Sequence, residues 1–246
     1  MLNNITLGKY YQKDSVIHRL NPVFKIISLV IMIISIFFID SYIDVIMLGS
    51  YLLLSIMYSN IGMRVYLKNI FGIKIFLIFI LIINLIFYTG FNRIVFDLFK
   101  IIFIILYSSI LTYTTVITEL TYGIERILKP FNRIIPVSDI AMVITLTIRY
   151  IPSLTYEANR IIRAQKIRGI NFDTNNIKEK IVSISGILMP MFVMSIKKSN
   201  TMADIMDLRL YNYGKSKTNY RSNNWKILDT LLLILNILIL IIVIFY

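Results

Sequence analysis

The sequence predicts an all-helical, polytopic membrane protein, and three observations support this fold class. Hydrophobic residues make up 57% of the 246 positions, and only 16% of the residues are charged. The mean hydropathy is +0.76, which is rare for a soluble domain of this length. The apolar residues are gathered in five long runs, and most of the basic residues lie between those runs. A net charge of +13 placed in this way suits anionic lipid headgroups rather than nucleic acid.

The five apolar runs are the expected transmembrane helices. They cover Phe24–Ile39, Ile43–Tyr58, Ile70–Tyr88, Ile94–Thr118 and Ile227–Tyr246. At about 1.5 Å per residue, the last run reaches roughly 30 Å and the first two roughly 24 Å. The shorter runs therefore need a thinned bilayer or flanking side chains that reach the interface, as we expect of Lys25, Lys74 and Lys100. Asp97 must lie near the membrane surface, unless its helix begins later.

The distribution of basic residues predicts the orientation of these spans. The connection after the first run is acidic, with Asp40 and Asp44, whereas the connection after the second run is basic. Cytosolic connections carry the excess of Lys and Arg, so the amino terminus and the second connection are expected in the cytosol. The basic residues used here are Lys9, Lys13, Arg19, Lys25, Arg64 and Lys68. The first residues are polar and contain no segment typical of a removable signal peptide.

Residues 119–225 are expected to form a cytosol-facing coupling region between the membrane regions 1–118 and 226–246. The stretch from residue 119 to 226 holds 17 of the 26 Lys and Arg residues and 8 of the 13 acids. One long amphipathic helix is predicted from Ser138-Asp139, a favourable helix start, to the stop at Gly169. A second is predicted to open at Asn176, with Glu179 completing a capping box, and to run towards Tyr211.

Two prolines fall inside these predicted helices. Pro152 and Pro190 should kink the helices rather than end them, because the amphipathic pattern continues past both. The segment Ile181–Ile196 is also apolar enough to be read as an ordinary transmembrane span. That crossing would export the basic residues that follow it, against the usual bias, whereas two kinked helices lying along the inner surface avoid the conflict.

Two short motifs close the predicted helices of the coupling region. The first is Ala164-Gln165-Lys166-Ile167-Arg168-Gly169, and the second runs from Ala203 through Met206 to Arg209. A cation at the carboxyl end of a helix gains roughly 0.3–1 kcal/mol from the helix dipole. The preceding alanines permit the close approach of another backbone, and an arginine on a rigid helix end offers two parallel hydrogen bonds to a partner. Two such ends, presented side by side, predict a docking surface for a cytosolic partner.

These motifs resemble those of a known family, the transmembrane T component (EcfT/CbiQ-like) of energy-coupling factor transporters, a branch of the ATP-driven importers. The family is marked by two Ala-Arg-Gly signatures at the ends of its coupling helices. The first motif matches closely, whereas the second has Leu210 where the family usually has glycine, which leaves the local packing of that end in question.

Three further segments resemble the family in the expected order along the chain. Gly8-Lys9-Tyr10 and the following His18-Arg19-Leu20-Asn21-Pro22 with Lys25 resemble its amino-terminal segment. Glu125-Arg126-Ile127-Leu128-Lys129-Pro130 and Ile148-Arg149-Tyr150-Ile151-Pro152 resemble its central coupling region. The resemblance implies structural or coupling roles for His18, Arg19, Pro22, Lys25, Pro130, Arg149 and Pro152. From the residues themselves, His18 is expected to order the amino-terminal segment together with Arg19.

The resemblance also implies a mechanism and a set of partners. Two cytosolic ATPase subunits would bind the helix ends, and ATP hydrolysis would move a separate substrate-binding membrane protein, the S component, to import a vitamin or metal ion. The docking residues would be Ala164, Gln165, Arg168, Gly169, Ala203, Met206 and Arg209. The chain itself would bind no cofactor and no nucleic acid, and ATP and magnesium would belong to the ATPases. It would be a non-catalytic, multi-pass subunit of the cell membrane.

Two other classes of function stay open on the residues alone. A membrane enzyme acting on lipid or isoprenoid substrates would use a divalent metal held by Asp40 with Asp44, or by Asp204 with Asp207. A secondary transporter would need ionisable residues at span midpoints, and none is evident. His18 is the only histidine, cysteine is absent, and the sequence has no phosphate-binding glycine-rich loop.

Overall fold

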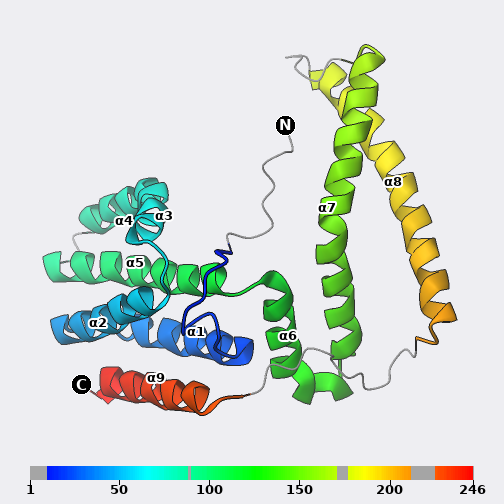
Figure 1. Cartoon of the computed structure of the whole chain (residues 1–246). Helices are drawn as coiled ribbons and strands as arrows, with labels where there is room; N and C mark the ends of the chain where they lie inside the picture. Colours follow the sequence, from blue (N-terminus) through cyan, green and yellow to red (C-terminus); the bar gives the residue numbers. More distant parts are fainter. Residues whose placement is uncertain (1–9, 88–89, 171–176, 212–224, 246) are drawn as a thin grey trace. The chain divides into compact units, whose positions relative to one another are not determined.

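The structure is a computed structural model that describes residues 10–87, 90–170, 177–211 and 225–245. Nine α-helices and one 3-10 helix make up the regular structure of these ranges, and they contain no strand. Figure 1 shows the helices in chain order. They are α1 (Pro22–Phe37), α2 (Tyr42–Tyr58), α3 (Met63–Gly72), α4 (Lys74–Ile86), α5 (Phe91–Thr114), α6 (Ile117–Leu128), the 3-10 helix η1 (Lys129–Arg133), α7 (Val137–Ile167), α8 (Ile177–Leu208) and α9 (Ile227–Phe245).

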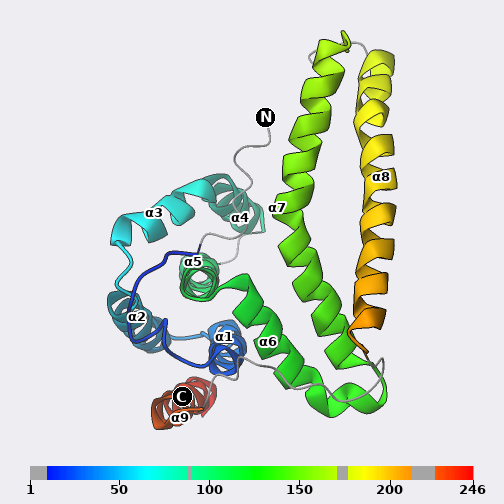
Figure 2. The ribbon, with the colours of Figure 1, turned by 45° about the vertical axis from the view of Figure 1, so that its right-hand side comes forward.

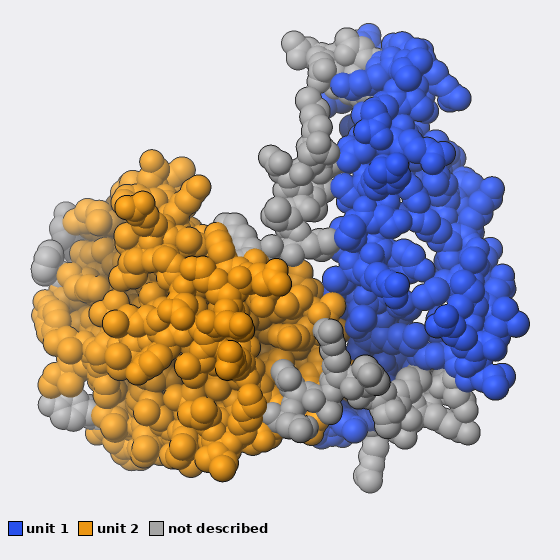
Figure 3. Space-filling view, in the orientation of Figure 1, with its two compact units in different colours: residues 1–5, 129–218 blue, residues 6–128, 219–246 orange. Residues whose placement is uncertain are grey.

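The chain divides into two compact units, coloured separately in Figure 3. One unit comprises residues 6–128 and 219–246, and contains α1 to α6 with α9. The other comprises residues 129–218 with residues 1–5, and contains η1, α7 and α8. The division falls at residue 129, so α6 belongs with the amino-terminal helices and α9 rather than with α7 and α8.

The larger unit is built around α1 and α5. Helix α1 packs against α5, α6 and α9, and α5 packs in turn against α2, α3 and α4. Its core is apolar and aromatic: Met32, Ile36, Ile39, Val45, Leu48, Leu52, Ile56, Ile61, Tyr66, Phe103, Leu106, Tyr107, Ile110, Tyr113, Ile239 and Val243. The Tyr107 hydroxyl inside this core donates a hydrogen bond to the Leu48 carbonyl, so its polar group is satisfied where water is excluded.

Local sequence explains where the first two helices begin. Asn21 caps α1 by accepting a hydrogen bond from the Val23 N–H, and proline occupies the first helical position. Ser41 and Asp44 form a capping box at the start of α2. The Asp44 carboxylate thus accepts hydrogen bonds from the backbone and hydroxyl of Ser41. This assignment corrects the interpretation of Asp40 and Asp44 as a metal-binding pair, because Asp44 serves the helix end.

The third and fourth apolar runs are not single straight helices. The run expected at 70–88 is divided between α3 and α4, which meet after Gly72 at an angle of 53°. Glycine at this point weakens the helix, because it gives up the most backbone freedom on folding and offers no side chain to pack. The run expected at 94–118 ends earlier, since α5 stops at Thr114 and Thr115 is extended. Helix α5 begins at Phe91, so Asp97 lies in its second turn, near the helix end, as a surface position requires.

Four helices of the described ranges are long and apolar enough to cross a membrane, or five if the bent pair α3 and α4 forms one span. The four are Asn92–Thr114, Val137–Ile167, Glu179–Leu208 and Ile227–Phe245. Helices α1 and α2 are apolar but shorter, with 16 and 17 residues. The fold is therefore the expected all-helical, multi-pass membrane protein. The length and composition of α8 are compatible both with a crossing of the membrane and with the expected placement along its inner surface.

The second unit is an antiparallel hairpin of two long helices, α7 and α8, which lie side by side in Figures 1 and 2. They contain 31 and 32 residues, and at about 1.5 Å per residue each is roughly 46–48 Å long. Pro152 and Pro190 lie inside the helices, as predicted, and neither ends its helix. Helix α7 begins one residue before Ser138. The predicted opening of the second helix at Asn176 falls outside the described residues.

Candidate functional site

The carboxyl end of α7 is a Schellman motif centred on Arg168. Arg168 is the C-cap residue, and Gly169 follows it in the left-handed conformation, with a φ of 86°. The Ile170 N–H donates to the Gln165 carbonyl at 3.1 Å, and the Gly169 N–H donates to the Lys166 carbonyl at 3.1 Å. These bonds satisfy carbonyls that a helix end leaves without partners. The arginine therefore projects from a turn whose backbone is fixed on both sides.

The carboxyl end of α8 repeats this turn around Arg209. The Tyr211 N–H donates to the Met206 carbonyl at 2.9 Å, and the Leu210 N–H donates to the Asp207 carbonyl at 2.9 Å. Leu210 has a φ of 56°, so it adopts the left-handed conformation that Gly169 adopts at the other end. The departure from glycine thus leaves the turn intact. The cost is backbone strain, because a side chain at positive φ crowds its own carbonyl.

Both arginines are exposed, and so are the alanines that precede them, Ala164 and Ala203. A cation here lies against the negative end of the helix dipole, which favours the charge. Because the alanines expose little more than backbone, another chain can approach the last turn of either helix closely. Met206 and Gln165 are half-buried. Each end therefore presents one exposed arginine, on a turn held by backbone hydrogen bonds, beside a small-residue surface.

A side chain anchors each end to the opposite helix of the hairpin. The Gln165 amide donates to the Gly186 carbonyl at 3.0 Å, so this predicted docking residue has a hydrogen-bond partner within its own chain. The Tyr211 hydroxyl donates to the Asp139 carboxylate at 2.8 Å, at the start of α7. The expectation that the arginines are presented side by side is wrong. Since α7 and α8 are antiparallel, Arg168 and Arg209 lie at opposite ends of the hairpin.

In the larger unit, Lys25 secures the corner between α5 and α6. Its ammonium group donates to the Thr114 carbonyl at 3.0 Å, to the Thr115 hydroxyl at 3.2 Å and to the His18 carbonyl at 3.3 Å. Lys25 is 6% exposed, which corrects the expectation that its stem reaches the membrane interface. The ammonium instead caps the last carbonyl of α5, where a helix favours a cation.

His18 orders the amino-terminal segment through partners other than the expected Arg19. One ring nitrogen lies 2.6 Å from the Ser15 hydroxyl, and the other lies 3.0 Å from the Tyr11 carbonyl. Burial, assisted by the nearby charge of Lys25, lowers the pKa of His18 below its usual value. Arg19 points to Asp14 at 4.0 Å in an exposed ion pair, which contributes little to stability.

The remaining predicted coupling residues lie at helix starts and on helix surfaces. Pro22 is buried at the first position of α1, whereas Pro130 is exposed in η1. Arg149 and Pro152 are exposed on α7. The structure thus brings Pro22 together with Lys25 and His18 in one unit, and Arg149 with Pro152 in the other.

Sequence reasoning missed two residues that anchor these sites. Asp229 is fully buried at the start of α9 and accepts hydrogen bonds from the backbone N–H groups of Asn21 and Lys226. It therefore fixes α9 to the start of α1. Tyr211 anchors the end of α8. An acid in the first turn of a predicted helix is the signal for Asp229, but no pattern indicates that its partner lies 208 positions away.

Across the described part of the chain, no group of three or more His, Cys, Asp or Glu side chains is placed to hold a metal ion. Asp204 and Asp207, the second acid pair considered, are both exposed in the last turns of α8. Acids so exposed are solvated, and nothing around them completes a coordination shell.

Comparison with known proteins agrees with these features. Residues 13–220 match the family described as cobalt transport protein, CbiQ. The chain belongs to this family. It is 33% identical over 255 aligned residues to the energy-coupling factor transporter transmembrane protein EcfT of Streptococcus equi subsp. equi, an alignment that covers 97% of this chain and 95% of that protein.

Two further relatives carry the same name. The EcfT of Ruminiclostridium cellulolyticum is 32% identical, with 94% of this chain and 92% of that protein covered. The EcfT of Bacillus subtilis is 27% identical, with 94% and 93% covered. The family expected from the ordered set of sequence motifs is confirmed over nearly the full length of the chain.

Proposed function

We propose that this chain is the energy-coupling transmembrane subunit of an energy-coupling factor importer. It binds two cytosolic ATPase subunits and a separate substrate-binding membrane protein, the S component, which takes up a micronutrient such as a vitamin or a metal ion. The names of its relatives support the transporter class. The role of each part of the chain is argued from the geometry of the hairpin.

The observation that carries the proposal is the repetition of one turn at the two ends of the hairpin. Arg168 and Arg209 are both exposed residues that close their helices, and both are fixed by the same pair of backbone hydrogen bonds. Helices of 31 and 32 residues separate them by several tens of ångströms. One arginine per end, at that separation, suits one ATPase subunit per end rather than two arginines in a single groove.

Movement of the ATPase subunits is passed on through α7 and α8, because a hydrogen-bonded helix transmits a displacement along its length. ATP and magnesium bind in the ATPases, so this chain contributes no catalytic group and no cofactor site. The hairpin faces the cytosol, and the amino terminus lies on the same side, as the distribution of basic residues favours.

The membrane-enzyme alternative has less support. It requires an acid pair free to bind a divalent metal, yet Asp44 is engaged in the capping box of α2. Asp204 and Asp207 belong to the last turns of α8, within the second arginine motif. No observation on the described residues favours the enzyme over the transport subunit.

The test is charge reversal at the two ends in the assembled transporter. Arg168→Glu and Arg209→Glu, singly and together, are produced with the ATPase subunits and the S component, and co-purification and substrate uptake are measured. Each single variant should lose at least 2 kcal/mol of docking energy, which is roughly thirtyfold in affinity, as buried arginine anchors do. Arg160→Glu is the matched control, since Arg160 is exposed on α7 about two turns before Arg168 and lies outside the motif. Full uptake by the double variant would refute the proposal.

The sidedness of the hairpin has its own test. The sequence contains no cysteine, so a single cysteine introduced near either end is the only thiol of the chain. A membrane-impermeant thiol reagent added outside intact cells should leave Ala164→Cys and Ala203→Cys unmodified, and should modify them in inside-out vesicles made from cells that lack the ATPase subunits. Labelling of either position from outside would overturn the cytosolic placement.

A further inference from the structure

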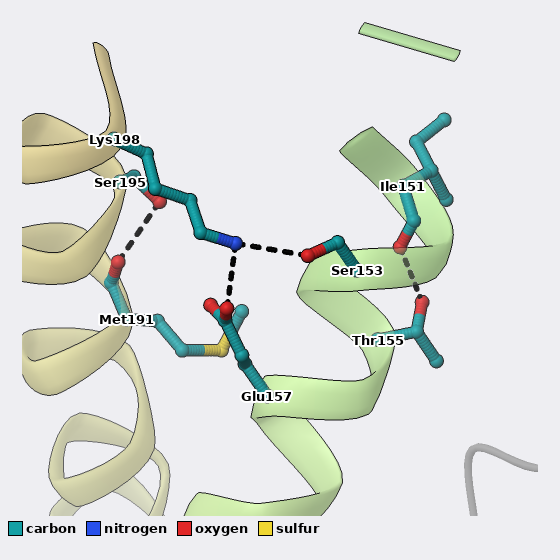
Figure 4. Close-up of polar contacts among 7 residues, drawn as sticks. All are labelled: Ile151, Ser153, Thr155, Glu157, Met191, Ser195 and Lys198. Atoms are coloured by element: carbon teal, nitrogen blue, oxygen red, sulfur yellow. Dashed lines mark hydrogen bonds and ion pairs between the residues drawn. The ribbon is translucent and has the colours of Figure 1, made fainter. Parts of the chain in front are cut away.

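An ion pair joins α7 to α8, and each of its members lies ten residues before the last residue of its helix. The Lys198 ammonium lies 2.5 Å from a carboxylate oxygen of Glu157 and donates to the Ser153 hydroxyl at 2.9 Å. It also lies 6.0 Å from the centre of the Tyr150 ring. Figure 4 shows Lys198 reaching from α8 to the two side chains of α7. Among the described residues, this is the one ion pair that links the two helices.

The pair is partly withdrawn from water. The Lys198 side chain is 32% exposed and the Glu157 side chain is 16% exposed. Exposed ion pairs contribute little, whereas a pair at this depth loses much of its solvation and depends on its partner. Removing one member leaves a poorly solvated charge on the other. The position of the two helices at this level is therefore tied to the integrity of the pair.

Apolar packing does little to hold the hairpin together. Of the most apolar stretch of α8, only 6% is buried, and the corresponding share of α7 is 17%. In most helix pairs, interdigitated side chains fix the angle between the axes. Here, the polar contacts carry a larger part of that task than they do in an ordinary helical hairpin.

Both helices have features that favour bending close to the ion pair. Pro152 precedes Glu157 on α7, and the Thr155 hydroxyl donates back to the Ile151 carbonyl at 2.9 Å. On α8, Pro190 is followed by Ser195, whose hydroxyl donates back to the Met191 carbonyl at 2.9 Å. Proline removes a helical hydrogen bond, and such back-donation competes with the next one, so these turns bend more easily.

We propose that Glu157 and Lys198 form a clasp that fixes the angle between α7 and α8, and with it the separation of Arg168 and Arg209. They are positioning residues for energy coupling and do not contact the ATPases. This proposal rests on the proposed function. Without the clasp, the two arginine ends still dock, but movement of the ATPases bends α7 and α8 at their weak turns instead of moving the membrane helices.

The test measures uptake per ATP hydrolysed in the complete transporter. Glu157→Gln and Lys198→Met should retain both ATPase subunits and ATP hydrolysis. Uptake per ATP should fall about tenfold, a factor within the range of coupling free energies between residues in direct contact. The exchange variant, Glu157→Lys with Lys198→Glu, should recover most of the loss, because the Ser153 hydroxyl can donate as well as accept. Lys197→Met is the matched control, since Lys197 is adjacent and exposed.

A distance measurement separates positioning from general damage. Spin labels on cysteines replacing Val143 and Asn200, both exposed, report the spacing of α7 and α8 without background thiols. Lys198→Met should broaden the distance distribution in the assembled transporter, and the exchange variant should narrow it again. If a single variant does not assemble, the exchange variant decides, because its recovery supports the clasp and its failure overturns it.

Failure of this proposal differs from failure of the proposed function. If the unaltered chain binds no ATPase subunit, the proposed function fails. If it binds them, and Lys198→Met leaves both uptake per ATP and the label distances unchanged, only the clasp is refuted.

Discussion

Leu210→Gly should stabilise the end of α8, because Leu210 now adopts a conformation that suits glycine. A left-handed backbone costs about 1–2 kcal/mol for a residue with a side chain. The change to glycine offsets roughly 0.5–1 kcal/mol of this gain, because glycine loses more backbone freedom on folding than leucine does. The Leu210 side chain is 88% exposed, so its removal forfeits almost no burial. The expected net gain is about 1 kcal/mol, or roughly fivefold in the equilibrium for opening the turn.

Hydrogen exchange of the purified protein in detergent or nanodiscs reads this equilibrium directly. The Leu210 and Tyr211 amides close the turn, so both should exchange about fivefold more slowly when residue 210 is glycine and opening is local. Because residue 210 itself is replaced and residue 211 is not, the Tyr211 amide gives the cleaner comparison. Arg209 should keep its exposure, and ATPase binding should persist.

The reverse change at the other end of the hairpin is the matched control. Gly169 has a φ of 86°, so Gly169→Ala places a side chain where the backbone disfavours it. A Cβ atom there meets nothing within 4 Å, which leaves backbone strain as the whole effect. The Ile170 amide should exchange about fivefold faster. Slower or unchanged exchange at Ile170, or faster exchange at Tyr211 in Leu210→Gly, would refute the strain argument.

Two further predictions concern the larger unit. Gly123→Val should destabilise the packing of α6 on α1 by about 1–3 kcal/mol, since even a Cβ atom would lie 2.7 Å from Ile26 and 3.3 Å from the Pro22 backbone. Thermal unfolding should report this loss of stability, and an unchanged melting temperature would contradict the close approach. Lys25→Met should lower the free energy of unfolding by about 1–3 kcal/mol, because it removes the hydrogen-bond donor of the buried Thr114 carbonyl. An unaltered melting temperature would show that water replaces the ammonium group.

The arginine ends illustrate what the sequence could predict. Gly169 after an amphipathic pattern marked the end of α7, and Arg168 was correctly placed at that end, because helix stops depend on neighbouring residues. The same reasoning could not foresee that Leu210 keeps the turn. That outcome depends on the balance between local strain and the hydrogen bonds of Tyr211, which residue type alone does not reveal.

Contacts between distant segments were beyond sequence reasoning. Lys25 was interpreted as reaching the interface because it lies near the end of an apolar run, whereas its acceptor at Thr114 lies 89 positions away. The prediction that Arg168 and Arg209 lie side by side was wrong for the same reason. Two helix ends that resemble each other in sequence lie together in a parallel pair and apart in an antiparallel one, and the pattern of each helix is the same in both cases.

The antiparallel arrangement also gives the hairpin an approximate half-turn symmetry that exchanges its two ends. The symmetry is imperfect: one end has Gly169 and a glutamine tied to a backbone carbonyl, and the other has Leu210 and a tyrosine tied to a carboxylate. Two copies of one protein could approach both ends in the same way, yet they would meet different neighbours there. If one ATPase subunit binds at each end, as proposed, the nearly symmetric hairpin would still present a different environment to each of them.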